Sequence, residues 1–320
     1  MVEDLNANLL TSFDVAKVFK DNNKQINAVD FDVSGSLCIT SSDDESLRVY
    51  DVKSGKLKNT VYSKKYGCCL ARFTHGASTI IYASTKQDDA LRYMSFHDNN
   101  YIRYFKGHSK RVVSLDMSPK DDTLLSGSLD DTVRLWDLKS PNCQALLHTT
   151  GGVPLVSFDH SGVVFAVGLG SSQLRLYSLA NFSKGPFLSV TVKPHLNQRS
   201  PEWSKISFSK DGKHILISTK SNVMYLLDAF KCQVMHVLRG HVNDMHLPLD
   251  GCFTPDGAFV LSGSQDNKIY CWDVATGQLL SPSLDWHRSP PKVVAFNPKY
   301  MMFASADTNL VSFNTLVFID

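Results

Sequence analysis

The sequence lacks the features that mark membrane, secreted and disulfide-framed proteins. No run of 18 or more apolar residues occurs in the 320-residue chain, so no segment is long enough to span a membrane. The opening stretch, MVEDLNANLL, begins acidic and has no long apolar core, which argues against a secretory signal. The seven cysteines are odd in number and form no CxxC pair, so neither a disulfide framework nor a zinc site is predicted. We expect buried thiols in a reducing compartment.

Catalytic and phosphate-binding signatures are missing as well. The sequence contains no GxxxxGK[ST], HExxH or GxSxG motif, and its eleven histidines show no ligand spacing. Lysine and arginine number 33 against 31 acidic residues, a formal net charge of +2, whereas dedicated nucleic-acid binders usually carry a clear basic excess. We therefore expect no enzyme, no cofactor and no direct nucleic-acid binding.

What the sequence does contain is an internal repeat. SGSLDDTVRLWD at 126–137 and SGSQDNKIYCWD at 262–273 nearly superimpose, and SSDDESLRVYD at 41–51 follows the same plan. Each unit is typical of a strand, a polar turn and a second, alternating strand. Gly-His precedes two of them, at 107–108 and 240–241. Gly-His followed by Trp-Asp at a period of 40–45 residues is the known signature of WD-repeat propellers.

Weaker copies of the repeat fill the rest of the chain. If the aromatic residue of each unit, or its equivalent, is taken as an anchor, seven anchors follow at steps of 41 to 50 residues. They are Tyr50, Met94, Trp136, Tyr177, Leu227, Trp272 and Phe313. The longest step contains an insertion at 190–203, predicted as a loop because Pro194 and Pro201 cannot donate to a central ladder. We predict an all-β, seven-bladed WD-repeat β-propeller that occupies residues 1–320 as a single domain.

The last repeat leaves no room for an outer strand after Phe313. The stretch VAKVF at 15–19 precedes the first full unit and is strand-like. We predict that it pairs with the last blade and closes the ring, which leaves few unpaired strand edges.

Several residues that suggest chemistry are predicted to be structural. Two sets occupy the positions where WD repeats build a buried hydrogen-bond chain: His108, Ser126, Asp130 and Trp136, and His241, Ser262, Asp266 and Trp272. The serine of each set stays open to a shift of two positions, to Ser128 or Ser264. A Ser–His–Asp set suggests a hydrolase, but here it recurs at blade spacing with a tryptophan that completes a polar network. Weaker repeats have Asp44, Asp88 and Asp307 at the matching turn, whereas the fourth and fifth units have Ser171 and Ser221, where no network is expected.

Two groups of charged residues are candidate binding features. The loop before each first strand and the turn between second and third strands share one rim, which in the second and third units carries Lys64, Lys65, Tyr66, Lys86, Lys110 and Arg111. These can receive an acidic or phosphorylated peptide, and the alternative is a solvated loop surface. Asp30, Arg72 and Asp116 occupy equivalent positions of three innermost strands. We expect Arg72 to bridge the two carboxylates in the channel, and the alternative is solvated channel lining.

Stretches outside the repeat motifs resemble one family of WD-repeat proteins. The longest are HDNNYIRYFKGHSKRVVSL at 97–115 and FSKDGKHILIST at 208–219, joined by YSKKYG, KSPNCQ, KGPF, DAFK, VMH, FNPK and FASA. From about residue 15 to 306 the chain resembles the WD repeat-containing protein 82 family. Its members are WD-repeat subunits shared by COMPASS histone methyltransferase complexes and RNA polymerase II termination complexes.

The resemblance implies a non-catalytic nuclear scaffold. Members of the family bind the N-terminal region of a SET-domain methyltransferase that acts on lysine 4 of histone H3, and help place it at the phosphorylated C-terminal domain of RNA polymerase II. A second pool joins a protein phosphatase regulatory subunit, or the mRNA 3′-end cleavage and polyadenylation machinery, in transcription termination. The family offers no catalytic residues. If phosphopeptide recognition is direct, Lys64, Lys65, Tyr66, Lys110 and Arg111 are the candidates.

The chain departs from the family in two places, and other propeller functions remain as alternatives. VSFNTLVFID at 311–320 stands where a Phe-Trp pair and a proline are expected, and residues 240–251 also diverge. A ubiquitin ligase substrate receptor typically has arginine two residues after the Trp-Asp or Tyr-Asp ends, where this chain has Lys53, Lys139 and Ala275. A G-protein β subunit needs a long N-terminal coiled-coil helix, and only about twenty residues precede the first repeat.

Overall fold

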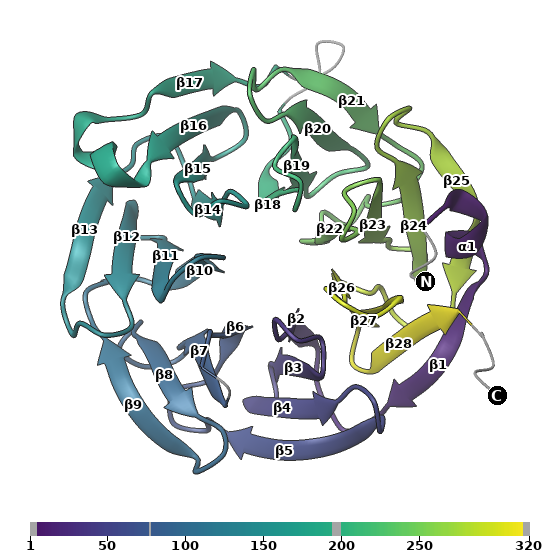
Figure 1. Cartoon of the computed structure of the whole chain (residues 1–320), viewed down its shortest axis with the longest axis horizontal. Helices are drawn as coiled ribbons and strands as arrows, with labels where there is room; N and C mark the ends of the chain where they lie inside the picture. The colour runs from purple at the N-terminus through teal and green to yellow at the C-terminus, as the bar shows by residue number, and fades with distance from the viewer. Residues whose placement is uncertain (1–4, 77, 194–199, 316–320) are drawn as a thin grey trace.

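A computed structural model describes residues 5–76, 78–193 and 200–315 of the chain. Its strands form seven four-stranded antiparallel sheets, arranged as the blades of a ring around a central channel (Figure 1). In six blades the four strands follow one another along the chain from the channel outward. The predicted all-β, seven-bladed propeller is confirmed.

Each blade contributes one strand to each of four concentric layers. The innermost strands are β2 (Ile26–Phe31), β6 (Cys69–Phe73), β10 (Val112–Met117), β14 (Pro154–Phe158), β18 (Trp203–Phe208), β22 (Gly251–Phe253) and β26 (Val293–Phe296). The second strands are β3 (Leu37–Ser42), β7 (Thr79–Ala83), β11 (Thr123–Ser128), β15 (Val164–Leu169), β19 (His214–Thr219), β23 (Phe259–Gly263) and β27 (Met302–Ala306). The third strands are β4 (Ser46–Asp51), β8 (Leu91–Ser95), β12 (Thr132–Asp137), β16 (Gln173–Ser178), β20 (Met224–Asp228), β24 (Lys268–Asp273) and β28 (Leu310–Thr315). The outer strands are β5 (Lys56–Tyr62), β9 (Asn100–Phe105), β13 (Cys143–His148), β17 (Leu188–Thr191), β21 (Val234–Leu238), β25 (Leu279–Asp285) and β1 (Phe13–Phe19).

The N-terminal strand closes the ring. β1 pairs antiparallel with β28, with Val15 opposite Phe313 and Phe19 opposite Leu310, so it supplies the outer strand of the seventh blade. The strand begins two residues earlier than predicted because Phe13 is buried, with its ring centroid 5.5 Å from that of Phe303. A five-residue helix, α1 (Ala7–Thr11), lies before β1 and against β25. The predicted closure by the N-terminal strand is confirmed.

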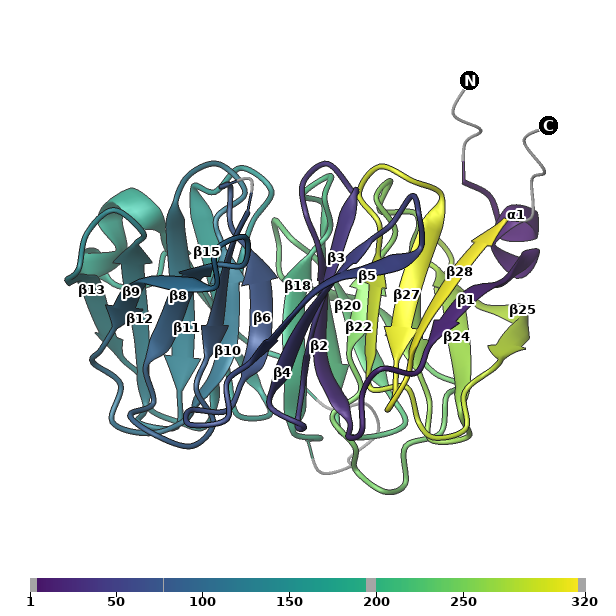
Figure 2. The same ribbon diagram turned by 90° about the horizontal axis from the view of Figure 1, so that it is seen from below.

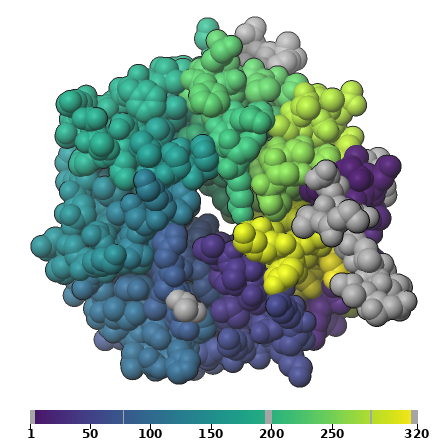
Figure 3. All heavy atoms as spheres, viewed as in Figure 1, coloured from purple at the N-terminus to yellow at the C-terminus, as the bar shows by residue number. Residues whose placement is uncertain are grey.

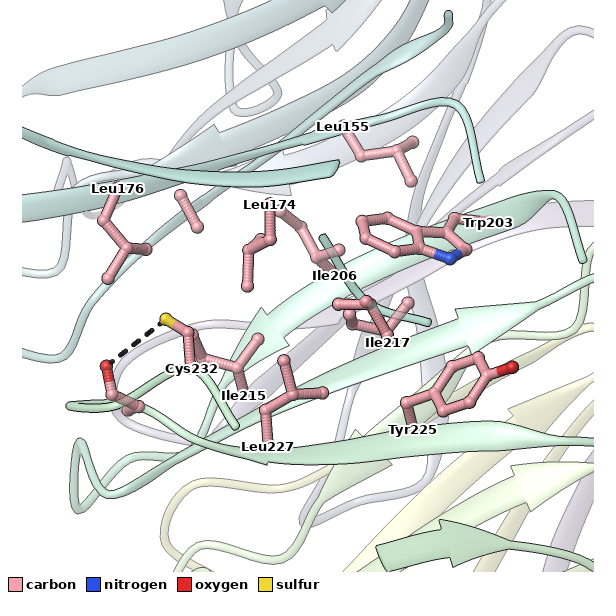
Figure 4. Packing of buried hydrophobic residues seen from close by; sticks show 13 residues of the cluster. Leu155, Leu174, Leu176, Trp203, Ile206, Ile215, Ile217, Tyr225, Leu227 and Cys232 are labelled. Atoms are coloured by element: carbon pink, nitrogen blue, oxygen red, sulfur yellow. Dashed lines mark hydrogen bonds between the residues drawn. The ribbon is translucent and has the colours of Figure 1, made fainter. Parts of the chain in front are cut away.

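The core lies between neighbouring blades, because the channel occupies the centre of the ring. The seven anchor residues all lie in the third strands and are all buried. Between the fourth and fifth blades, Leu155 and Leu174 pack towards Trp203, Ile206 and Ile217 (Figure 4). Each blade therefore buries its apolar faces only by contacting the next blade.

The repeated SGS string has a packing reason. A Cβ atom on Gly127 would lie 2.3 Å from the carbonyl oxygen of Pro154 in the next blade, and one on Gly263 would lie 1.8 Å from that of Pro291. Both distances are far inside van der Waals contact, so the second strands of the third and sixth blades approach the following innermost strand only with glycine there.

The longest repeat distributes its extra residues differently from the prediction. Besides the loop between β17 and β18, the fourth blade inserts a short 3-10 helix, η1 (Leu179–Lys184), between β16 and β17. Pro201 lies in the loop, whereas Pro194 is outside the described residues. The divergent stretch 240–251 ends at the first residue of β22, a strand of three residues. In the last repeat, residues 316–320 are also outside the described part.

The loops that join successive blades lie on one side of the ring, which we call the joining face (Figure 2). The turns between second and third strands lie on the same face, since backbone hydrogen bonds connect the two kinds of segment, as from Thr85 N to Tyr66 O at 2.9 Å. In Figure 2, α1 lies towards the opposite face. This arrangement puts the candidate rim of the second and third blades on the joining face.

The cysteines and helices add few chemical possibilities. All seven cysteines are free, and burial raises the thiol pKa of Cys68 to about 12 and of Cys69 to about 11. The described residues contain no cluster of three or more His, Cys, Asp or Glu side chains that would suit a metal ion. Within the same residues, no helix is long and apolar enough to cross a membrane.

Candidate functional site

The third blade contains a continuous buried hydrogen-bond chain. The indole Nε1 of Trp136 donates to Ser126 Oγ at 2.8 Å, and Ser126 Oγ lies 2.7 Å from His108 Nε2. The other ring nitrogen, Nδ1, lies 2.9 Å from Asp130 Oδ2. The protonated Nδ1 donates to the ionised carboxylate, so the unprotonated Nε2 accepts from the serine hydroxyl. The chain links the loop before β10 to the hairpin of β11 and β12.

The charges in this chain favour a neutral imidazole next to an ionised carboxylate. Burial lowers the pKa of His108, and this outweighs the opposite effect of Asp130. For Asp130, burial alone would raise the pKa, but hydrogen bonds from Thr132, Ser109 N and His108 lower it to about 2. Ser126 is fully buried with its hydroxyl engaged twice, so no substrate can reach it in this arrangement.

In the sixth blade the expected second chain is not formed. His241 Nε2 donates instead to Ser221 O of the fifth blade at 3.1 Å, and Trp272 Nε1 donates to Arg239 O at 2.8 Å. Ser262 Oγ bonds to the neighbouring carbonyl of Gly263. The carboxylate of Asp266 is taken by another partner, the hydroxyl of Tyr270 at 2.7 Å. His241, Ser262 and Trp272 are buried and Asp266 is exposed, and competing partners break the predicted connection.

The first two blades use arginine where the third uses histidine, which the sequence analysis missed. In the second blade, Arg92 is 1% exposed, and its Nη atoms lie 3.0 Å from the carboxylate oxygens of Asp88. Its Nη1 also bonds to Ser84 Oγ. In the first blade, Arg48 lies 3.2 Å from Asp44 in the same way. Each arginine follows its turn aspartate by four residues, but Arg134 follows Asp130 at the same spacing in the third blade without pairing with it, so the spacing alone could not have identified the pairs.

The seventh blade contains a shortened version of the chain. His287 Nε2 lies 2.6 Å from Ser305 Oγ, and its Nδ1 lies 3.5 Å from Asp307 Oδ1. Phe313 stands in place of tryptophan and has no N–H to add. His287 was not predicted, because Trp rather than Gly precedes it. In the fourth and fifth blades, Ser171 and Ser221 stand at the turn; Ser221 Oγ lies 2.8 Å from Thr219 Oγ1.

On the joining face, the structure brings four of the six rim residues together. Lys64, Lys65 and Tyr66 lie in the loop between β5 and β6, and Lys86 lies in the turn between β7 and β8. Lys86 N donates to Tyr66 O at 2.9 Å, and Lys86 Nζ donates to Lys64 O at 3.1 Å. Lys86 Nζ also lies 2.6 Å from Glu45 Oε1, which compensates its charge. Lys86 thus holds the loop in place, and Lys64 and Lys65 remain as its exposed cations.

Tyr66 connects this loop to the buried network of the second blade. Its ring centroid lies 3.5 Å from the Arg92 guanidinium carbon and 5.2 Å from Lys65 Nζ. Hydrogen bonds from Lys65 and Arg92 hold the pKa of the Tyr66 phenol below its usual value. Cations over an aromatic face are attracted by its quadrupole, so the Tyr66 ring attracts both the exposed Lys65 and the buried Arg92.

The other two rim residues lie on the next loop. Lys110 and Arg111 precede β10 and are exposed, and their carbonyl groups accept from Ser128 Oγ and Leu129 N of the adjacent turn. Among the described residues, no hydrogen bond or ion pair joins these two side chains to Lys64, Lys65 or Lys86. The rim therefore consists of two basic loops on neighbouring blades. We call all six residues the basic rim.

The channel residues have partners other than those expected. Asp30 Oδ2 accepts from Phe73 N at 2.9 Å, and Asp116 Oδ2 accepts from Phe158 N at 2.8 Å, so each carboxylate links its blade to the next. Burial raises the pKa of both carboxyl groups, although the charge of Arg72 acts to lower it. Within the described residues, Arg72 makes no ion pair within 4.0 Å, so its predicted bridge between the two carboxylates is not formed.

Comparisons with known proteins cover nearly the whole ring. A model of the WD domain, G-beta repeat, matches residues 13–51, 99–137 and 232–273. The chain is 48% identical to WD repeat-containing protein 82 of Drosophila melanogaster, over 94% of each chain. It is 36% identical to COMPASS component SWD2 of Saccharomyces cerevisiae, over 95% of each chain. It is 38% identical to Set1 complex component swd2 of Schizosaccharomyces pombe, over 82% of this chain and 75% of the relative.

Proposed function

The chain belongs to the WD repeat-containing protein 82 family, and from this premise we propose that it is a non-catalytic scaffold subunit of a nuclear, COMPASS-like histone H3 lysine 4 methyltransferase complex. The observation that carries the proposal is similarity along nearly the full chain to relatives named as COMPASS and Set1 complex components. The partners proposed with it are a SET-domain methyltransferase and the other COMPASS subunits.

A scaffold role agrees with the chemistry of the described residues. Two sets resemble a catalytic triad, and the serine of each is fully buried: the hydroxyl of Ser126 bonds to both a histidine and a tryptophan, and that of Ser305 bonds to His287. A nucleophile has to reach its substrate, and Ser126 has no free surface from which to do so. The polar chain instead links a loop to a hairpin, which is a structural task.

We infer further that the basic rim links the complex to the phosphorylated C-terminal domain of RNA polymerase II. Lys64, Lys65, Lys110 and Arg111 make no ion pair within 4.0 Å among the described residues, so their charges are available to a ligand. Phosphate accepts charge-assisted hydrogen bonds from lysine and arginine. Tyr62, exposed beside Lys64 with 5.7 Å between Nζ and the ring centroid, adds aromatic surface for an extended peptide.

Binding to the methyltransferase is tested with purified proteins. The full chain is immobilised and incubated with the recombinant N-terminal region of a SET-domain methyltransferase, with the same amount of an unrelated WD-repeat propeller as the control. We expect retention on this chain alone. If neither propeller retains the methyltransferase, while a phosphatase regulatory subunit or a cleavage and polyadenylation subunit is retained on this chain, the role lies in transcription termination instead.

Binding to the polymerase tail is tested by fluorescence anisotropy with a phosphorylated heptad-repeat peptide and its unphosphorylated form. We expect the phosphorylated form to bind more tightly, and charge reversal of Lys110 and Arg111 to weaken it at an unchanged melting temperature. Reversal of Lys53 and Lys58, which are exposed outside the rim and make no ion pair within 4.0 Å among the described residues, is the matched control. Undiminished binding by the Lys110 and Arg111 variant would show that the rim is not the receptor.

A further inference from the structure

Two connected cavities open the centre of the joining face. The deeper one, which we call the channel cavity, has a volume of about 330 Å³, and the outer one, the mouth cavity, about 440 Å³. Both volumes lie in the range of ligand sites. They share the lining residues Asn27, Leu70, Arg111, Val113, Ser204 and Pro248, so they form one continuous space. Figure 3 shows the other end of the central channel, on the face opposite the joining face.

The channel cavity has an excess of basic groups without a carboxylate partner. Four basic side chains line it, against the three acidic side chains Asp43, Asp116 and Asp250. Lys205 is paired with Asp250 at 3.2 Å. Among the described residues, Arg72, Arg111 and Lys292 make no ion pair within 4.0 Å.

The acidic groups of the cavity are occupied by other contacts. Asp116 accepts from Phe158 N, and Asp43 Oδ1 accepts from Asn27 Nδ2 at 2.8 Å. Neither is within ion-pair distance of Arg72, Arg111 or Lys292. The three cations therefore line a space in which an incoming anion would meet N–H donors with little competition from carboxylates. Arg72 and Lys292 are half-buried, which reduces screening by bulk water, whereas Arg111 is exposed at the joining face.

The mouth cavity adds an apolar wall above these cations. Leu70, Val113, Leu129 and Val153 line it from the second, third and fourth blades, and Leu129 is 40% exposed. Leu70 has a φ of +57°, at the point where the register between β6 and β7 shifts. A left-handed backbone is unfavourable for a leucine, and such strain is concentrated at functional sites. Because of this shift in register, Leu70 lines both cavities, whereas Arg72 lines only the deeper channel cavity.

We propose that the mouth and channel cavities together bind an extended segment of a partner protein in which an acidic residue stands beside an aliphatic one. The carboxylate enters the channel cavity between Arg72, Arg111 and Lys292, and the aliphatic side chain packs on Leu70, Val113 and Leu129. Carboxylate and aliphatic groups match the two parts of the site by charge and polarity. This site is additional to the basic rim, with which it shares only Arg111, and does not depend on the proposed function.

The test begins with a phage-displayed library of random dodecapeptides, panned on the full-length chain. We expect enrichment of peptides in which aspartate or glutamate adjoins leucine, isoleucine or valine. The most enriched peptide is then synthesised and its Kd is measured by fluorescence anisotropy. Arg72→Gln should raise the Kd about tenfold, the effect typical of losing a hydrogen bond to a charged group. Higher salt should also raise it. Enrichment of peptides without acidic residues would overturn the proposal.

Matched variants separate this site from others on the same face. Arg288→Gln removes an exposed arginine that lines neither cavity and should leave the Kd unchanged. Lys292→Gln should weaken binding as much as Arg72→Gln does. If Arg72→Gln lowers the melting temperature, the test uses Lys292→Gln in its place. An affinity that Arg72→Gln and Lys292→Gln both leave unchanged would show that the peptide binds elsewhere. The selected peptide is also made with asparagine in place of its aspartate. If inorganic phosphate displaces both peptides at the same concentration, the site binds anions nonspecifically and the proposal is overturned.

The proposal for the basic rim and the proposal for the two cavities can be refuted independently of each other. Lys64→Gln combined with Lys65→Gln should weaken the polymerase-tail phosphopeptide and leave the selected acidic peptide at its wild-type Kd. If the phosphopeptide does not bind at all while the acidic peptide requires Arg72, the rim proposal falls and the channel proposal stands.

Discussion

The guanidinium carbon of Arg92 lies 3.5 Å from the ring centroid of Tyr66, while the Nη atoms of Arg92 hold both carboxylate oxygens of Asp88 at 3.0 Å. The N–H edge of the guanidinium thus belongs to the buried network of the second blade, while its carbon lies over the ring of a residue of the exposed rim. The relationship joins stability to binding, since the position of Tyr66 depends on a side chain that is 1% exposed.

Replacing Arg92 by lysine should affect both properties. Lysine keeps the charge but lacks the planar fork and the stacking surface, so Asp88 and Tyr66 cannot both be satisfied. We expect the free energy of unfolding to fall by about 1–3 kcal/mol, measured by urea denaturation, and phosphopeptide binding to weaken. Tyr66→Phe keeps the ring over Arg92 and serves as the control with a smaller effect. If Arg92→Lys changes neither quantity, Arg92 does not support the rim.

Ser126→Ala should destabilise the protein more than Ser262→Ala. The first change leaves His108 Nε2 and Trp136 Nε1 buried without their common partner, which costs about 1–3 kcal/mol. Ser262 occupies the equivalent position in the sixth blade but bonds only to the adjacent Gly263 carbonyl, so its loss should cost less. Chemical denaturation of both variants measures the difference. Equal losses of unfolding free energy would mean that the hydrogen-bond chain of the third blade contributes no more stability than a single local hydrogen bond.

Stability should fall on acidification in two steps linked to the third blade. The pKa of His108 is lower in the folded protein than its ordinary 6.5, and that of Asp130 is lowered from 3.8 to about 2. In both cases the unfolded chain binds more protons, so the free energy of unfolding decreases as pH falls. The loss should begin below about pH 6.5 for His108, and the contribution of Asp130 should be lost between about pH 4 and pH 2.

The histidine step is separable by mutation. Urea denaturation between pH 7.5 and pH 5.5 should show a smaller decrease in stability for His108→Gln than for the wild type. His97→Gln is the control, because the His97 side chain is 80% exposed. A wild-type pH dependence in His108→Gln would contradict the assignment.

Loss of the closing strand should destabilise the whole ring. Phe13→Ala in β1 removes a buried ring from the contact with Phe303 and should cost about 3–5 kcal/mol. Val18→Ala in the same strand, where the side chain is 41% exposed, should cost much less. Deletion of residues 1–20 should lower the melting temperature in one cooperative transition. An unchanged melting temperature after the deletion would contradict closure by β1.

The sequence predicted the architecture because the repeat is itself a packing requirement. Each unit buries its faces only against the next unit, so the anchors and the SGS glycines recur at blade spacing. The strand at 15–19 was predictable because it is strand-like and precedes the first full unit, where it can pair with the strand that contains Phe313. The helix η1 was not predictable in this way, because it lies between two strands of one blade and does not recur among the described residues of the other blades.

The hydrogen-bond partners in a polar network were predictable only where no other donor or acceptor competes for the same groups. The third blade follows its pattern, whereas in the sixth blade Tyr270 takes the carboxylate of Asp266 and the carbonyl of Ser221 takes the N–H of His241. Residue types alone do not rank such competing partners. The Arg72 bridge failed for a similar reason, because backbone N–H groups of the neighbouring blades lie closer to Asp30 and Asp116.

The proposed scaffold role is tested most directly by purifying the tagged, full-length chain from nuclear extract and identifying the co-purifying proteins by mass spectrometry. A SET-domain methyltransferase and further COMPASS subunits should be recovered with the wild-type protein. The same proteins should be recovered with the Ser262→Ala variant, which serves as the control. Recovery of cullin ubiquitin ligase subunits, or of phosphatase and cleavage factors without any SET-domain methyltransferase, would contradict it.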